Sequence, residues 1–126
     1  MKLHHIGVIT RDLQKCVSIY TKLGYTLKGG IVSDEIQFNR IAMMESAASP
    51  YIELIEPINQ MSSIYHFKAG YHHLCYEADR GEDIIGKFKE MKIGKIFTKP
   101  ISAPALDGKT VVFACLQDGT FMELII

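Results

Sequence analysis

Two histidines and two glutamates stand at matching positions of the chain and could together bind a metal ion. His5 and His73 lie in two similar segments, Leu-His-His-Ile-Gly-Val and Tyr-His-His-Leu-Cys-Tyr, and Glu53 and Glu123 lie in two later segments that also resemble each other. Two imidazoles and two carboxylates suit Ni(II), Co(II), Mn(II) or Zn(II), and the donor types do not choose among these ions. Such an ion acts as a Lewis acid on a carbonyl oxygen, which favours removal of a proton from the neighbouring carbon.

The two glutamates carry much of this hypothesis because their surroundings are apolar. They occupy the middle of Tyr-Ile-Glu-Leu-Ile and Phe-Met-Glu-Leu-Ile, both of which predict strands. A carboxylate in such a strand is costly to bury unless it is paired or coordinates a metal. Glu53 alone could equally face outward from an amphipathic edge strand. Two glutamates at equivalent positions, matched by two equivalent histidines, favour metal binding.

An internal repeat explains why these residues recur. Glu53 and Glu123 are 70 residues apart, and so are Gly24 and Gly94, which stand at the ends of two expected helices. Each half predicts a strand, a helix and three further strands. We expect one domain, 1–126, built of two modules, 1–58 and 69–126, with a polar joint around 57–70 and an irregular loop at 99–108. The helices are expected at 13–23 and 84–91, and the strands at 3–8, 26–33, 38–45, 51–55, 71–76, 95–98, 109–116 and 121–125.

Strand alternation selects one histidine from each His-His pair. Neighbouring side chains of a strand point to opposite faces, so His4 shares a face with bulky apolar residues, whereas His5 shares its face with Gly7. The same alternation separates His72 from His73. A sheet face covered by a helix needs the apolar set, and the face with small residues leaves room for a ligand. His5 and His73 are therefore the expected inward pair.

Composition excludes several classes of protein. The 126 residues are 48% hydrophobic and 22% charged, and the formal net charge is zero. Nothing in this balance indicates a surface for nucleic acid or for an anionic membrane, and the apolar stretches are too short to span a bilayer. The three cysteines are widely spaced and form no C-x-x-C motif, which favours reduced core thiols. We expect a cytoplasmic protein.

The repeated halves, together with His-His-Ile-Gly-Val, Ile-Glu-Leu-Ile-Glu-Pro, Tyr-His-His-Leu-Cys-Tyr and Asp-Gly-Thr-Phe-Met-Glu-Leu, resemble the vicinal oxygen chelate superfamily over the whole chain. That group includes glyoxalase I, methylmalonyl-CoA epimerase, extradiol dioxygenases and bleomycin-resistance proteins. The resemblance implies an α+β fold in which two βαβββ modules form an open half-barrel of the glyoxalase/bleomycin-resistance type. It also implies one divalent ion held by His5, Glu53, His73 and Glu123. In the family's isomerases a ligand glutamate acts as the base, which implies Glu123 first and Glu53 second.

Two related reactions remain open. A glyoxalase I-type reaction converts the hemithioacetal of methylglyoxal and a thiol into a hydroxyacyl thioester, and an acyl-CoA epimerase is the alternative. The epimerase pattern has an additional glutamate on the third strand of the first half, where the alignment places Arg40. An arginine cannot act as that base, so the glyoxalase reading is favoured, with Arg40 as a candidate for binding an anionic group of the substrate. A surface role for Arg40 is equally compatible with the sequence, and a one-residue slip would put it on the other face.

Other classes fit less well. A dioxygenase needs iron with open positions, and a fourth protein ligand leaves few of them. A ligand-sequestering protein of the bleomycin-resistance kind would lack the full ligand set, which is present here. The expected partners are a glutathione- or CoA-linked substrate and a second copy of the chain in a homodimer.

Overall fold

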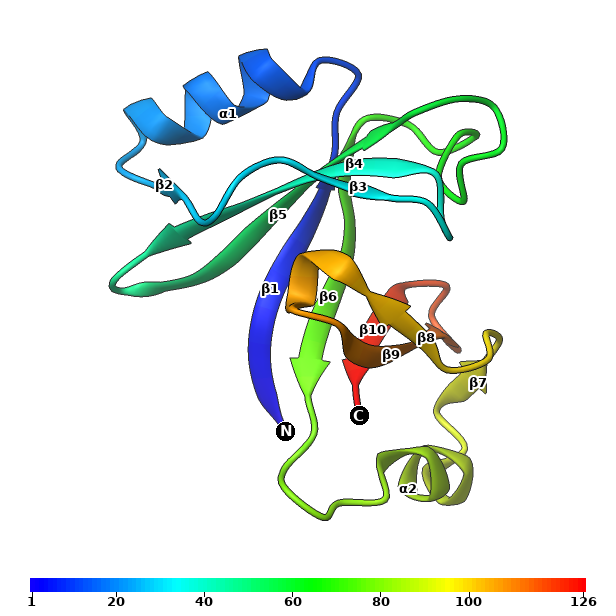
Figure 1. The fold of residues 1–126 in the computed structure, drawn as a ribbon. Helices are drawn as coiled ribbons and strands as arrows, with labels where there is room; N and C mark the ends of the chain where they lie inside the picture. The colour runs from blue at the N-terminus through cyan, green and yellow to red at the C-terminus, as the bar shows by residue number, and fades with distance from the viewer. The chain divides into compact units, whose positions relative to one another are not determined.

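A computed structural model describes residues 1–126. The chain forms two compact units. The N-terminal unit is His5–His72, and the C-terminal unit combines Met1–His4 with His73–Ile126. Each contains one α-helix and a mixed sheet (Figure 1). The predicted α+β class with two βαβββ modules of the glyoxalase/bleomycin-resistance type is confirmed.

The N-terminal unit orders its strands β2-β4-β5-β1, and β3 also pairs with β4. β1 and β5 run parallel, whereas β4 runs antiparallel to β5. One face of the sheet packs under α1, where Ala42, Met44, Ile52 and Leu54 form a buried cluster with Leu13. The elements are β1 (Lys2–Ile9), whose first three residues belong to the C-terminal unit, α1 (Leu13–Lys22), β2 (Thr26–Leu27), β3 (Val32–Asp34), β4 (Asn39–Ser46) and β5 (Ser49–Pro57).

Helix α1 is fixed at its start by two carboxylates. Asp12 is the N-cap and accepts a hydrogen bond from the backbone N–H of Lys15 at 3.0 Å. Oε2 of Glu56 accepts the backbone N–H of Leu13 at 2.7 Å, which ties the first turn of the helix to β5. The helix ends before Gly24, whose φ of +96° suits glycine.

The C-terminal unit orders its strands β6-β10-β9-β7, and β8 also pairs with β9. β6 and β10 run parallel, as β1 and β5 do in the other unit. Helix α2 packs through Ile84 and Phe88 on Val112, Ala114 and Leu124. The elements are β6 (Gly70–Glu77), whose first three residues belong to the N-terminal unit, α2 (Ile84–Met91), β7 (Gly94–Ile96), β8 (Ile101–Ala103), a short 3-10 helix (Pro104–Leu106), β9 (Lys109–Leu116) and β10 (Phe121–Ile125).

Two predicted element boundaries were wrong. The strand expected at 26–33 is interrupted between β2 and β3, and Gly29 has a φ of +75° in the break. The loop expected at 99–108 contains β8 and the 3-10 helix, because residues 101–103 pair with β9. Pairing of short segments with a neighbouring strand depends on tertiary structure, which local sequence patterns do not encode.

Gly94 has a different role from Gly24, although the repeat aligns them. Helix α2 ends at Lys92, which adopts a left-handed conformation with φ of +52°. Gly94 is the first residue of β7, and a Cβ atom there would overlap the backbone carbonyl of Cys115 on β9. This glycine is therefore required by the close approach of two strands. Neither helix has the length and apolarity of a membrane span.

Candidate metal centre

His5 and Glu53 face each other across the parallel pair of β1 and β5. In the strand register His5 pairs with Tyr51 and Gly7 pairs with Glu53, so the glutamate lies two residues beyond the partner of the histidine. The two side chains leave the sheet on the same face, and Nε2 of His5 lies 3.2 Å from Oε2 of Glu53. The imidazole is 0% exposed and the carboxylate 8% exposed. This half of the predicted ligand set is assembled within one unit.

His73 and Glu123 repeat that arrangement across β6 and β10. His73 pairs with Phe121 and Cys75 pairs with Glu123, which reproduces the diagonal offset of the first pair. Nε2 of His73 lies 3.4 Å from Oε2 of Glu123, and the two side chains are 2% and 4% exposed. The edge of the Phe113 ring meets the imidazole at a centroid distance of 5.8 Å. The second half of the predicted ligand set is thus assembled in the same way in the other unit.

A small side chain stands beside each glutamate. Gly7 is the lateral neighbour of Glu53, and Cys75 is the lateral neighbour of Glu123. Glycine has no side chain and cysteine a short one, so each glutamate can lean towards its histidine across the strand pair. The repeat therefore preserves the small neighbour as well as the ligand types.

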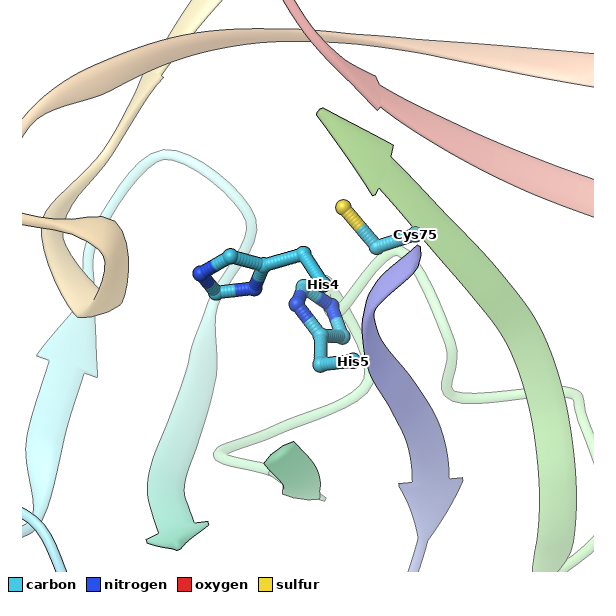
Figure 2. A group of neighbouring side chains, drawn as sticks. All are labelled: His4, His5 and Cys75. Atoms are coloured by element: carbon cyan, nitrogen blue, oxygen red, sulfur yellow. The ribbon is translucent and has the colours of Figure 1, made fainter. Parts of the chain in front are cut away.

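The strand alternation predicted from sequence is present at both His-His pairs. His4 and His5 are consecutive residues of β1, and Figure 2 shows their side chains together with that of Cys75 on β6. His5 is fully buried beside Glu53, whereas His4 is only half-buried. His72 packs edge-on against the ring of Phe67, with the centroids 4.8 Å apart. Within each unit, the histidine that meets a glutamate is the predicted one.

The chemistry of each pair fits a divalent ion. Imidazole nitrogen and carboxylate oxygen are common ligands of Zn(II), Co(II), Ni(II) and Mn(II). A carboxylate less than a tenth exposed is expensive to keep unless a cation or hydrogen-bond donor compensates it. A neutral imidazole can direct its nitrogen lone pair to the same point as the carboxylate oxygens. A cation bound at that point neutralises the charge of the carboxylate. Both pairs meet these requirements.

Arg40 is not on the face that carries His5 and Glu53. It pairs with Glu56 in the register of β4 and β5, two residues along from Ala42 and its partner Leu54, which pack under α1. The guanidinium Nη1 lies 3.1 Å from Oε1 of Glu56, and the arginine side chain is 41% exposed. The structure therefore places Arg40 beside the start of α1. Substrate binding by Arg40 stays a prediction from sequence.

Two further basic residues, Lys109 and Arg11, make contacts within the protein. Lys109 forms an ion pair with Glu77 at 2.6 Å, which lowers the pKa of Glu77 chiefly through that hydrogen bond. Arg11 donates to the backbone carbonyls of Tyr65 and Phe67 at 2.9 and 2.7 Å, which fastens the segment between β5 and β6. These contacts give both cations structural roles.

The sequence reasoning did not single out Lys28, Tyr51, Phe97 or Phe121. Tyr51 and Phe121 are the register partners of His5 and His73, so they flank the two His–Glu pairs. Nζ of Lys28 lies 4.9 Å from the centroid of the Tyr51 ring. The repeat contained a usable signal, because Tyr51 and Phe121 stand two residues before Glu53 and Glu123.

Comparison with known proteins identifies the family of the chain. The family model described as the Glyoxalase/Bleomycin resistance protein/Dioxygenase superfamily matches residues 4–113. Among solved structures, methylmalonyl-CoA epimerase from Mycobacterium tuberculosis aligns with a TM-score of 0.85 at 20% identity, covering 98% of this chain and 86% of that one. No curated protein matches the sequence.

Two further solved structures share the fold. A variant of the Streptomyces coelicolor methylmalonyl-CoA epimerase, in complex with 2-nitronate-propionyl-CoA, has a TM-score of 0.82 at 20% identity, covering 99% of this chain and 96% of that one. A methylmalonyl-CoA epimerase in complex with methylmalonyl-CoA and ammonium has a TM-score of 0.79 at 22% identity, covering 98% and 92%. At such identities the likeness shows the fold alone. With the family model matching most of the sequence, the chain belongs to the Glyoxalase/Bleomycin resistance protein/Dioxygenase superfamily, whose vicinal oxygen chelate fold it shares.

Proposed function

We propose that this chain is a divalent-metal-dependent enzyme that removes a proton from the carbon beside a thioester carbonyl, and that it epimerises an acyl-CoA. The observation that carries the proposal is the pair of buried His–Glu contacts, 3.2 Å in one unit and 3.4 Å in the other, at equivalent positions of the repeat. One ion bound by His5, Glu53, His73 and Glu123 would satisfy both pairs. Two donors alone are few for a tightly held ion, which supports a shared one.

The ion, when bound, would polarise the thioester carbonyl and stabilise negative charge on its oxygen. The protein's own residues would then move the proton. Glu123 is our first choice as base: its carboxylate takes the proton from the α-carbon while the C–H bonding electrons form the enolate double bond. A carboxylate in this role contributes a factor of about 10² to 10⁴ in rate. Return of a proton to the opposite side of the α-carbon completes epimerisation, and Glu53 is the equivalent carboxylate of the other repeat.

The epimerase reading replaces glyoxalase I as the first choice for two reasons. The sequence argument for glyoxalase rested on Arg40 in place of a catalytic glutamate, and Arg40 packs on the α1 face of the sheet, away from Glu53. The presence of an arginine at position 40 is therefore no argument against a second catalytic base. Several solved structures with the same fold are methylmalonyl-CoA epimerases, which supports a CoA thioester over a glutathione adduct as the substrate.

The proposal is tested by proton exchange in D₂O. Wild-type protein is loaded in turn with Ni(II), Co(II), Mn(II) and Zn(II) and mixed with methylmalonyl-CoA or with the hemithioacetal of methylglyoxal and glutathione. We expect metal-dependent deuterium incorporation at the α-carbon of methylmalonyl-CoA. Formation of lactoylglutathione without exchange into methylmalonyl-CoA would restore the glyoxalase reading. Absence of both reactions with every ion would contradict the enzyme assignment.

A further inference from the structure

Lys28 and Phe97 are structural equivalents, although they are 69 residues apart, whereas Glu53 and Glu123 are 70 apart. Lys28 follows β2 and donates its backbone N–H to the carbonyl of Met43 at 2.8 Å. Phe97 follows β7 and donates its backbone N–H to the carbonyl of Phe113 at 2.9 Å. Met43 and Phe113 are in turn the register partners of Glu53 and Glu123. Each of the two residues therefore lies two strands from a glutamate of the proposed metal centre.

The side chains at these equivalent positions contact equivalent aromatic residues. The ring of Phe97 meets that of Phe121 edge-on, with a centroid distance of 6.0 Å. Lys28 places Nζ 4.9 Å from the centroid of Tyr51 and 3.4 Å from its hydroxyl oxygen. An aromatic pair in one unit thus corresponds to a cation on an aromatic ring in the other. The repeat is symmetric in its ligands and asymmetric in the residues that flank them.

The ammonium group of Lys28 is available to an anion. The lysine is exposed, and its contacts are the ring and hydroxyl of Tyr51, with no carboxylate among them. Lys87 and Lys109, by contrast, form ion pairs with glutamates at 2.8 and 2.6 Å. A cation held over an aromatic face keeps its charge and is restricted in position, which lowers the entropic cost of binding an anion.

Tyr51, which holds this cation, stands on the same strand as Glu53. It lies two residues from Glu53 on β5, so the two side chains leave the same face of the sheet. Neighbouring strands are separated by about 4.8 Å, which puts the backbone of Lys28 roughly 10 Å from that of Glu53 across β4. That spacing suits a charged group of the substrate beside the reacting centre rather than at it.

We infer that Lys28, held over Tyr51, binds an anionic group of the thioester substrate, either a phosphate of the thiol carrier or a carboxylate of the acyl group. The inference rests on the proposed function for the identity of the substrate and names the residue that recognises its charge. Lys28 is assigned to affinity and orientation, and the proton transfer stays with the two glutamates of the proposed function. The equivalent Phe97–Phe121 pair of the other unit carries no charge.

Binding measurements with three probes separate the two anions. Methylmalonyl-CoA carries both phosphates and a carboxylate, propionyl-CoA lacks the carboxylate, and methylmalonyl-pantetheine lacks the phosphates of the nucleotide part. Dissociation constants are measured by calorimetry on metal-loaded wild type, Lys28→Met, Lys28→Arg and the exposed helix control Lys22→Met. A phosphate contact predicts that Lys28→Met weakens the two CoA thioesters roughly tenfold and spares methylmalonyl-pantetheine. A carboxylate contact predicts that it weakens the two methylmalonyl probes and spares propionyl-CoA.

Rescue and controls complete this test. Lys28→Arg keeps a cation that stacks on an aromatic ring, so we expect it to recover most of the affinity. The inference is overturned if all three constants change less than twofold in Lys28→Met, if Lys22→Met has an equal effect, or if wild type binds none of the probes. Failure of the proposed function looks different: the probes bind and depend on Lys28, yet deuterium exchange is absent.

Discussion

Nε2 of His5 lies 3.2 Å from Oε2 of Glu53, and the two residues come from parallel strands whose register offsets them by two positions. The same offset joins His73 to Glu123 in the second repeat. A parallel β-pair fixes such diagonal neighbours rigidly, because the side chains project from paired backbones rather than from loops. The pairs are therefore preformed within each unit.

Replacing Glu123 by glutamine should remove the base while leaving a neutral oxygen ligand. We expect the rate of deuterium exchange into methylmalonyl-CoA to fall by at least about 10²-fold, since an amide does not accept the proton. The exposed Glu90 on α2 supplies the matched control, and Glu90→Gln should exchange at the wild-type rate. An equal loss in both variants would show that the effect is general and would remove Glu123 from its assigned role.

Removal of the metal should lower thermal stability as well as activity. A ligand present at a thousand times its dissociation constant stabilises the folded state by about 4 kcal/mol. For a chain of this size each kcal/mol corresponds to roughly 3–5 °C in Tm. Calorimetry before and after chelation, followed by addition of Ni(II) or Zn(II), measures this shift. An unchanged Tm through the whole cycle would argue that no ion is bound by the folded protein.

Glu56 should matter for stability and not for chemistry. Glu56→Ala leaves the backbone N–H of Leu13 at the start of α1 without its acceptor and also removes the Arg40 ion pair, at a cost of about 1–3 kcal/mol. Arg40→Met removes only a half-exposed ion pair and should cost less than about 1 kcal/mol. Urea unfolding measures both. A raised KM in Arg40→Met would support the sequence-based assignment of Arg40 to substrate binding, whereas the contact with Glu56 leads us to expect no change.

A single methyl group at position 94 should destabilise the C-terminal unit. In Gly94→Ala the new Cβ would overlap the carbonyl of Cys115, which forces β7 away from β9 and costs about 1–3 kcal/mol. Gly30→Ala is the control, because a Cβ there meets nothing within 4 Å. Urea unfolding should separate the two variants. Equal midpoints would mean that β7 moves without cost.

The sequence was sufficient to predict the repeat and the strands that hold His5, Glu53, His73 and Glu123. Alternation of side chains and the burial cost of a carboxylate are local physical arguments, and they need no knowledge of strand order. The contact of each histidine with its glutamate depends on the pairing of β1 with β5 and of β6 with β10, which only the structure gives.

The features that sequence reasoning assigned differently or missed have physical causes. Arg40 was aligned with a catalytic position, but strand alternation turns a one-residue uncertainty into the opposite face. Lys28 and Phe97 were not recognised as equivalents because their spacing is 69 and not 70, and the difference becomes visible only through their hydrogen bonds to Met43 and Phe113. Gly94 looked like a helix terminator, yet its role comes from a strand that lies more than 20 residues later, at Cys115.

The central claim, that the two His–Glu pairs hold one divalent ion, is tested most directly by the number of ions bound per chain. Metal-free wild type, His5→Ala, His73→Ala and the control His4→Ala are dialysed against Ni(II) or Zn(II) at equal free concentration and their metal content is determined. We predict one ion per chain in wild type and in His4→Ala, and a large loss of affinity in both His5→Ala and His73→Ala. Full occupancy in either of these two variants, or none in wild type, would contradict the claim.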